Sequence, residues 1–269
     1  MKYGTTNGLQ VMTAACCAGI LALAGCGGGG DQSASKPADK PAANQTAPAQ
    51  TAAAATSRVT GHIKFEGAAP KPTKIMMDAD PVCKKQHDAE VYINEYIVDA
   101  AGNLANVFVY VKNYSGPKPA APKDTVLFDQ RGCEYFPHVF GLRAGQPLAI
   151  LNSDPTLHNI HAVPTINPQF NLAMPKQGMR VTKTFQKNEV MVKIKCDVHS
   201  WMAAYVGVLD HPYFAVSATG GAFDIGPLPP GTYEIEACHE KLGTMTQTVT
   251  VGENATSSAN FTFTAKAGA

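Results

Sequence analysis

Residues 190–209 read VMVKIKCDVHSWMAAYVGVL, and this stretch decides the fold. Val and Ile are frequent at its start, and Val and Tyr at its end, as is typical of strands. The loop between the two predicted strands carries Cys196, His199 and Met202, each three residues after the last. A thiol, an imidazole and a thioether on such a tight loop can wrap around one ion. The stretch therefore predicts two strands joined by a metal-binding loop.

A second histidine comes from an upstream stretch. His158 lies in NSDPTLHN (152–159), which follows a predicted strand. A blue-copper centre needs two imidazoles, one thiolate and a weak axial thioether. His158 and His199 supply the imidazoles, Cys196 the thiolate and Met202 the thioether. These four residues are the predicted ligands of one type 1 copper ion.

Three alternatives compete with this copper site. His161 is a rival ligand, but residues three apart in an extended strand point to opposite faces. We therefore expect His158 to bind the ion and His161 to be packed or exposed. Zinc is a rival ion for Cys and His, although the thioether of Met202 favours copper. In the third alternative, Cys196 is only a small buried hydrophobe without a metal.

Strand signals dominate the rest of the folded part. Many segments alternate apolar and polar residues, and no long stretch has a helical period. We therefore predict an all-β protein built of sandwich layers. The other strand candidates are Val59–Phe65, Val107–Val111, Leu148–Leu151, Val181–Phe185, Tyr213–Val216, Phe223–Ile225, Tyr233–Ala237, Thr246–Val251 and Phe261–Phe263.

Residues 143–209 resemble the cupredoxin family, and within it the amicyanin group and its plastocyanin-like relatives. The resemblance rests on the HNIH pattern at 158–161 and on the Cys-x-x-His-x-x-Met loop. It implies a Greek-key β-sandwich in which His158, Cys196 and His199 are equatorial ligands and Met202 is axial. It also implies that Asn159 ties the two ligand loops together by hydrogen bonds near the thiolate.

A different module is expected at the C-terminus. The stretch FDIGPLPPGTYEIEA (223–237) resembles the carboxypeptidase-regulatory-like, or transthyretin-like, β-sandwich. Such modules usually have seven strands, whereas residues 210–266 supply only four or five. Residues 58–115 are therefore expected to contribute N-terminal strands, with the copper domain at 116–209 inserted between the two parts.

The N-terminus has the pattern of an exported lipoprotein. Residues 1–25 combine Lys2 with a short apolar run and end in Leu-Ala-Gly before Cys26, which resembles a lipobox. The resemblance implies that Cys26 carries a lipid and anchors the protein in a bacterial envelope membrane, by family analogy the outer one. An ordinary signal peptide with a chance Cys is the alternative. Residues 26–57 are rich in Gly, Ala and Pro and predict a disordered tether.

Four cysteines remain in the folded part. Cys83 and Cys133 have no ligand role in the copper site, so we predict a disulfide between them, which fits an oxidising compartment. The alternatives are free thiols or a second metal site formed with His87 and His138. Cys238 is expected to be an unpaired thiol.

The predicted function is the transfer of single electrons. A net charge of +1 with 16% charged residues does not mark a nucleic-acid binder. A copper ion with four protein ligands leaves no open position for a substrate, so no enzymatic activity is expected. A c-type cytochrome or a periplasmic dehydrogenase is the partner that family analogy implies. Copper delivery, and a structural β-module with a vestigial site, are the alternative functions.

Trp201 lies between two of the proposed ligands. Packing at a domain seam and partner docking beside an exposed edge of His199 are the two roles that the sequence leaves open for it.

Overall fold

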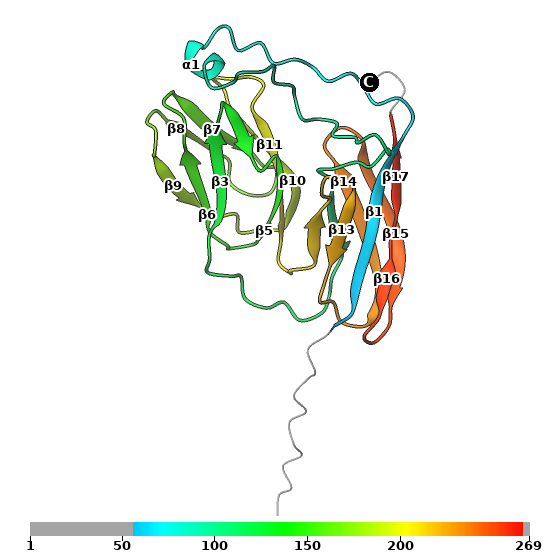
Figure 1. Ribbon diagram of the computed structural model, residues 1–269. Helices are drawn as coiled ribbons and strands as arrows, with labels where there is room; N and C mark the ends of the chain where they lie inside the picture. The colour runs from blue at the N-terminus through cyan, green and yellow to red at the C-terminus, as the bar shows by residue number, and fades with distance from the viewer. Residues whose placement is uncertain (1–55, 266–269) are drawn as a thin grey trace, which may run out of the picture. The chain divides into compact units, whose positions relative to one another are not determined.

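The computed structural model describes residues 56–265 and is almost entirely β in this range. It contains one short helix, α1 (Pro81–Lys84). The predicted all-β class is therefore confirmed (Figure 1). The strands are β1 (Arg58–Glu66), β2 (Phe108–Lys112), β3 (Val126–Arg131), β4 (Glu134–Phe136), β5 (Val139–Arg143), β6 (Leu148–Asn152), β7 (His158–Val163), β8 (Phe170–Met174), β9 (Arg180–Lys183), β10 (Glu189–Lys195), β11 (Ala203–Leu209), β12 (Phe214–Val216), β13 (Ala222–Ile225), β14 (Gly231–His239), β15 (Gly243–Val251), β16 (Thr256–Ser258) and β17 (Phe261–Thr264).

The N-terminal predictions fall outside the described range. The signal segment, the lipidation site Cys26 and the tether as far as residue 55 are not part of it. Within residues 56–265, no helix has the length and the apolar character that a membrane-spanning segment needs.

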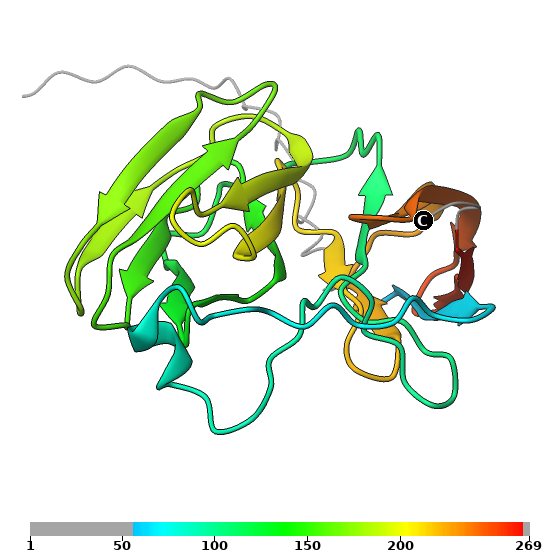
Figure 2. The same cartoon turned by 90° about the horizontal axis from the view of Figure 1, so that it is seen from above.

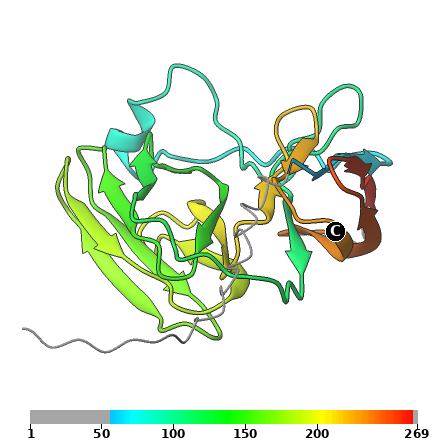
Figure 3. The ribbon, with the colours of Figure 1, turned by 90° about the horizontal axis from the view of Figure 1, so that it is seen from below.

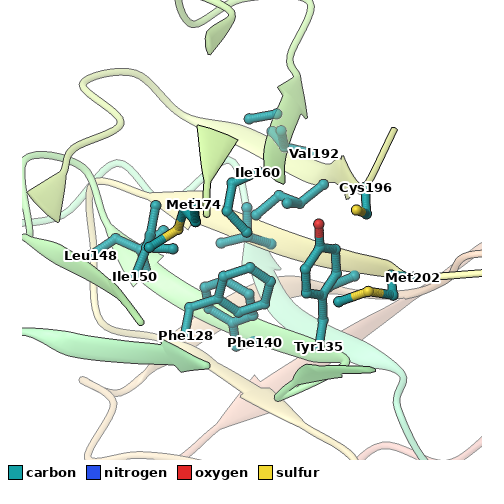
Figure 4. Close-up of a cluster of buried hydrophobic side chains, with 14 of the residues drawn as sticks. Phe128, Tyr135, Phe140, Leu148, Ile150, Ile160, Met174, Val192, Cys196 and Met202 are labelled. Atoms are coloured by element: carbon teal, nitrogen blue, oxygen red, sulfur yellow. The ribbon is translucent and has the colours of Figure 1, made fainter. Parts of the chain in front are cut away.

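The first sandwich consists of strands β3 to β11. One sheet has the order β5-β11-β10-β7-β8 and the other the order β4-β3-β6-β9. Alternate residues of both sheets point into a shared core that includes Phe128, Phe140, Leu148 and Ile160 (Figure 4). Because β10 lies between β7 and β11, the ends of these three strands meet at one edge of the sandwich.

The second sandwich combines strands from both ends of the folded chain. Its sheets have the orders β12-β2-β14-β15 and β13-β1-β16, with β17 also paired to β1. Strand β1 runs antiparallel to β13 and parallel to β16 and β17. Figures 2 and 3 show this blue strand beside the red C-terminal strands. The N-terminal strands β1 and β2 thus share a core with the C-terminal region.

The residues between β1 and β2 divide between the two sandwiches. The sequence grouped residues 58–115 as one region, but Ile75, Met77 and Cys83 pack into the core of the first sandwich. They do so from irregular backbone and the single turn of α1, so no strand periodicity marks them in the sequence. The cyan α1 lies at the end of the first sandwich in Figure 1.

Two paired glycines form a flat contact surface on the first sandwich. Gly207 on β11 lies opposite Gly141 on β5. A Cβ atom at Gly207 would lie 2.2 Å from the ring of Phe108, and one at Gly141 would lie 2.1 Å from the ring of Phe214. The two phenylalanine rings come from β2 and β12 and stack with centroids 5.6 Å apart. The missing side chains of the glycines therefore let the second sandwich pack closely on the first.

Candidate metal centre

Three of the four predicted ligands meet at the edge of the first sandwich. One donor atom each from His158, Cys196 and His199 lies within 4.8 Å of the other two, and all three side chains are buried. His158 begins β7, whereas Cys196 and His199 lie in the loop from β10 to β11. The imidazole rings have centroids 4.9 Å apart, and their Nδ1 atoms lie 3.0 Å from each other. Two stretches distant in the sequence thus present a sulfur and two ring nitrogens to one point.

Backbone hydrogen bonds fix the shape of the loop from β10 to β11. The N–H of Cys196 donates to the carbonyl of Met202 (3.1 Å), and the N–H of Met202 donates to the carbonyl of His199 (3.0 Å). The N–H of His199 donates to Sγ of Cys196 (3.3 Å). This last bond stabilises a thiolate, because an N–H donor favours the charged sulfur. These hydrogen bonds of the loop therefore hold its donors in place.

Met202 lies beside the donors in the core of the first sandwich. Its side chain is 1% exposed and belongs to the same buried cluster as Cys196 and Tyr135. Figure 4 shows Cys196 and Met202 at one end of this cluster, next to the ring of Tyr135. A thioether in this position has no access to water, so a soft metal ion is a suitable partner for it.

Asn159 connects the two ligand-bearing stretches. Its Oδ1 accepts a hydrogen bond from the N–H of Asp197 (2.6 Å) and lies 3.2 Å from Sγ of Cys196. Its Nδ2 donates to Asn171 on β8 and to the carboxylate of Asp197. These contacts match the tying role that the family resemblance implies for Asn159.

Each imidazole is held on its outer side by a carboxylate that the sequence analysis did not single out. Nε2 of His158 lies 2.8 Å from Oδ2 of Asp154, and Nε2 of His199 lies 2.9 Å from Oδ2 of Asp80. An Nε2–H that donates to a carboxylate leaves Nδ1 free to bind a metal. Asp154 lies four residues before His158, so this pair could be suspected from spacing. Asp80 is distant in the sequence, and only the fold places it there.

The electrostatics of the site favour a thiolate beside an imidazolium. Burial opposes ionisation of Cys196, but hydrogen bonds with His158 and His199 outweigh it and lower the thiol pKa to about 5. Burial likewise opposes charge on His158, but hydrogen bonds to Asp154 and Cys196 raise its pKa to about 9. Between these two pKa values, the proton on His158 compensates the negative charge of the Cys196 thiolate. It does so at the position where a metal cation would bind.

Cys83 and Cys133 form a disulfide, as the structure places their sulfur atoms within bonding distance. The alternative of a second metal site with His87 and His138 is wrong. Nε2 of His87 contacts the carbonyl of Gly132, and Nε2 of His138 contacts the carboxylate of Glu240. Neither ring reaches the disulfide sulfurs, because each is directed to another acceptor.

His161 and Trp201 surround the site without belonging to the donor group. Nδ1 of His161 contacts the carboxylate of Asp197 at 2.9 Å. The ring of Trp201 lies 5.0 Å from that of His199, and its Nε1–H donates to the carbonyl of Cys133 (2.9 Å). His199 itself is only 3% exposed. The expectation of an exposed His199 edge is therefore wrong, because Asp80 and Cys83 cover the ring.

Comparisons with protein-family models and with curated proteins found no match. Among solved structures, a purple cupredoxin from Nitrosopumilus maritimus is 22% identical with a TM-score of 0.27, and the match covers 30% of this chain and 97% of that one. A reduced mutant of amicyanin is 21% identical with a TM-score of 0.28, covering 31% and 81%. A copper-containing nitrite reductase from Thermus scotoductus is 17% identical with a TM-score of 0.28, covering 36% and 25%. TM-scores this low do not assign the chain to a family.

Proposed function

We propose that the chain binds one copper ion through His158, Cys196 and His199, with Met202 as a weak axial ligand. One observation carries the proposal: a sulfur and two imidazole nitrogens, all buried, lie within 4.8 Å of one another. Two imidazoles, a thiolate and a weak thioether are the donors of a type 1 copper site. The low pKa of the Cys196 thiol supports this assignment, because the thiolate is the form that binds a metal.

We further propose that the site transfers single electrons and has no enzymatic activity. A copper ion bound there supplies the one-electron couple between Cu(II) and Cu(I). The chain's own residues hold the donors in one geometry through the loop hydrogen bonds and the contacts of Asn159. Such a rigid set of donors limits rearrangement when the charge changes. Copper delivery is less well supported, because every donor is buried and none is presented for exchange.

The proposed setting is the bacterial envelope. A lipid on Cys26 would anchor the chain, and residues 26–57 would let the folded part move above the membrane. A c-type cytochrome or a periplasmic dehydrogenase is the proposed partner.

The test is a titration of the metal-free protein with Cu(II). We expect a single equivalent to produce intense absorption at about 600 nm, which a reductant removes and an oxidant restores. Cys196→Ser is expected to abolish this band. Cys238→Ser is the matched control, because Cys238 is also a buried free thiol but packs on β14 away from the site.

Each of the other outcomes of this titration excludes electron transfer or favours one of the alternative functions. A colourless copper complex without a reversible redox wave would exclude electron transfer. Rapid loss of copper to a weak chelator would favour delivery. Failure to bind copper at all would leave a structural β-module with a vestigial site.

A further inference from the structure

A short segment covers the outer side of the metal centre. This cap, residues 78–87, contains α1 and is joined to the β3–β4 turn by the disulfide between Cys83 and Cys133. A second contact reinforces it, since Nε2 of His87 donates to the carbonyl of Gly132 (2.7 Å). In Figures 2 and 3 the cyan cap lies at the end of the green strands of the first sandwich. The cap is thus fixed to the framework of the site at two points.

Asp80 uses its two carboxylate oxygens for two different tasks. Oδ1 accepts hydrogen bonds from the N–H groups of Val82 and Cys83, which caps the N-terminus of α1. Oδ2 accepts from Thr156 Oγ1 (3.2 Å) and lies 2.9 Å from Nε2 of His199. Thr156 lies just before His158, so a single oxygen of Asp80 connects the stretches that carry both imidazole ligands.

A further contact of the His199 ring is also made by the cap. Sγ of Cys83 lies 3.5 Å from Nε2 of His199. Asp80 and Cys83 together therefore cover this edge of the ring, and the His199 side chain is only 4% exposed. On the inner side, Nδ1 of His199 faces Nδ1 of His158 and Sγ of Cys196.

We propose that Asp80 is the positioning residue of the metal centre. Its carboxylate keeps the proton of His199 on Nε2, so that Nδ1 is always directed to the ion, and the cap keeps the ring edge closed. The negative charge of Asp80 also makes the imidazole a stronger donor, which stabilises Cu(II) relative to Cu(I). This second effect rests on the proposed copper site, whereas the position of the proton does not.

The test compares Asp80→Asn with Asp78→Asn. Asn is as good an N-cap as Asp, so the first variant keeps α1 but offers an NH₂ group to Nε2 of His199. Asp78→Asn removes the same charge two residues away, where the side chain is 64% exposed and pairs with Lys84. Asp80→Glu tests rescue, because it restores a carboxylate.

Two measurements are made on each protein. In the metal-free state, at a pH at which His199 is neutral, ¹⁵N chemical shifts of the imidazoles report the tautomer of His199. We expect Nε2–H in the parent, in Asp78→Asn and in Asp80→Glu, and a loss of that form in Asp80→Asn. In the copper-loaded state, we expect Asp80→Asn alone to raise the reduction potential and to lower Cu(II) affinity about 10-fold.

The outcomes separate the two proposals. If the parent binds no copper but the tautomer differs as expected, the copper function fails and the positioning role stands. If Asp80→Asn and Asp78→Asn have equal potentials and equal tautomers, the positioning role is wrong. If Asp80→Asn does not fold, the parent protein alone tests the proposal. A neutral His199 in the parent that carries its proton on Nδ1 would then overturn the proposal.

Discussion

Asp154 and His158 form a pair that is closed to solvent, with Oδ2 2.8 Å from Nε2 and side chains that are 1% and 0% exposed. The carboxylate also accepts the N–H groups of Gly132 and Cys133 and is therefore fixed in place. The ring must be protonated at Nε2 to donate to this carboxylate. Every metal ion that binds His158 has to replace the proton on the other nitrogen, Nδ1.

Copper affinity is expected to depend on pH through this proton. The pKa of His158 is raised to about 9, so the imidazolium is the main form at neutral pH and must lose one proton when copper binds. The pKa of Cys196 is about 5, so the thiol is already ionised and adds no further dependence. Apparent affinity should therefore rise with pH and level off near pH 9, with a slope of about tenfold per pH unit where His158 alone loses a proton. The slope should be steeper near pH 6, because burial is outweighed at His199 by hydrogen bonds to Cys196 and Asp80, which raise the pKa of this second imidazole as well.

A competition titration with a chelator of known affinity at each pH measures this slope. In Asp154→Asn, the pKa of His158 loses its main raising partner, so the plateau should begin at a lower pH. Affinity that stays constant between pH 6 and pH 9 would contradict the assigned protonation state.

Trp201 provides a direct optical reporter of the site. It is the one tryptophan of the sequence, and its ring lies 5.0 Å from that of His199. Bound Cu(II) is expected to quench its fluorescence strongly, with an end point at one equivalent. Zn(II) binds Cys and His but has a filled d shell, so it should leave most of the emission. Emission that bound Cu(II) leaves unchanged would show that copper binds away from Trp201.

Asn159→Ala is expected to lower both stability and copper binding. The substitution leaves the partly buried N–H of Asp197 without its acceptor, which costs about 1–3 kcal/mol in the free energy of unfolding. Urea unfolding of the metal-free protein measures this cost. Asn171→Ala is the control, because it removes exposed side-chain contacts to Asn159 and Asp197 but leaves the N–H of Asp197 bonded to Asn159. Its effect should stay within about 0.5 kcal/mol.

Gly207→Ala tests the close packing of the two sandwiches. The new Cβ would lie 2.2 Å from the ring of Phe108, and overpacking of this kind costs about 1–3 kcal/mol. The ring of Phe108 is fully buried and cannot move aside, so the melting temperature should fall. Combining the substitution with Phe108→Leu should recover part of the loss. Gly252→Ala is the control, since its Cβ would meet only Ala255 at an ordinary 3.5 Å.

The sequence predicted most strands with a strong apolar period and missed several short strands of the first sandwich. The segments with alternating or continuous Val and Ile became β1, β2, β6, β10 and β11. Strand β7 reads HNIHAV and was expected only from the ligand arrangement, because its His and Asn side chains serve the site rather than the strand pattern. The short β3 and β4 were missed for a related reason, since Asp129 and Glu134 interrupt their apolar residues.

The spacing of residues in the sequence predicted the metal-binding donors, but it did not predict the residues that surround them. Cys196 and His199 share one tight loop, so chain geometry alone limits how far apart they can lie. Asp80 reaches His199 only through the cap, and nothing in the local sequence around either residue encodes that contact. The closed ring edge was missed for the same reason, because covering segments are set by tertiary structure.

The pairing of β1 has a consequence for how the protein folds while it is being synthesised. Synthesis proceeds from the N-terminus, so β1 is made first, yet its partner strands begin at Ala222 and end with Thr264. The half that carries the cysteine and the two histidines is complete at Leu209, before any of those partners exists. Apart from backbone hydrogen bonds to Gly102 and Leu104, the backbone groups of Arg58–Glu66 therefore stay unpaired until then. This nascent strand is the place where the chain is most exposed to wrong pairing.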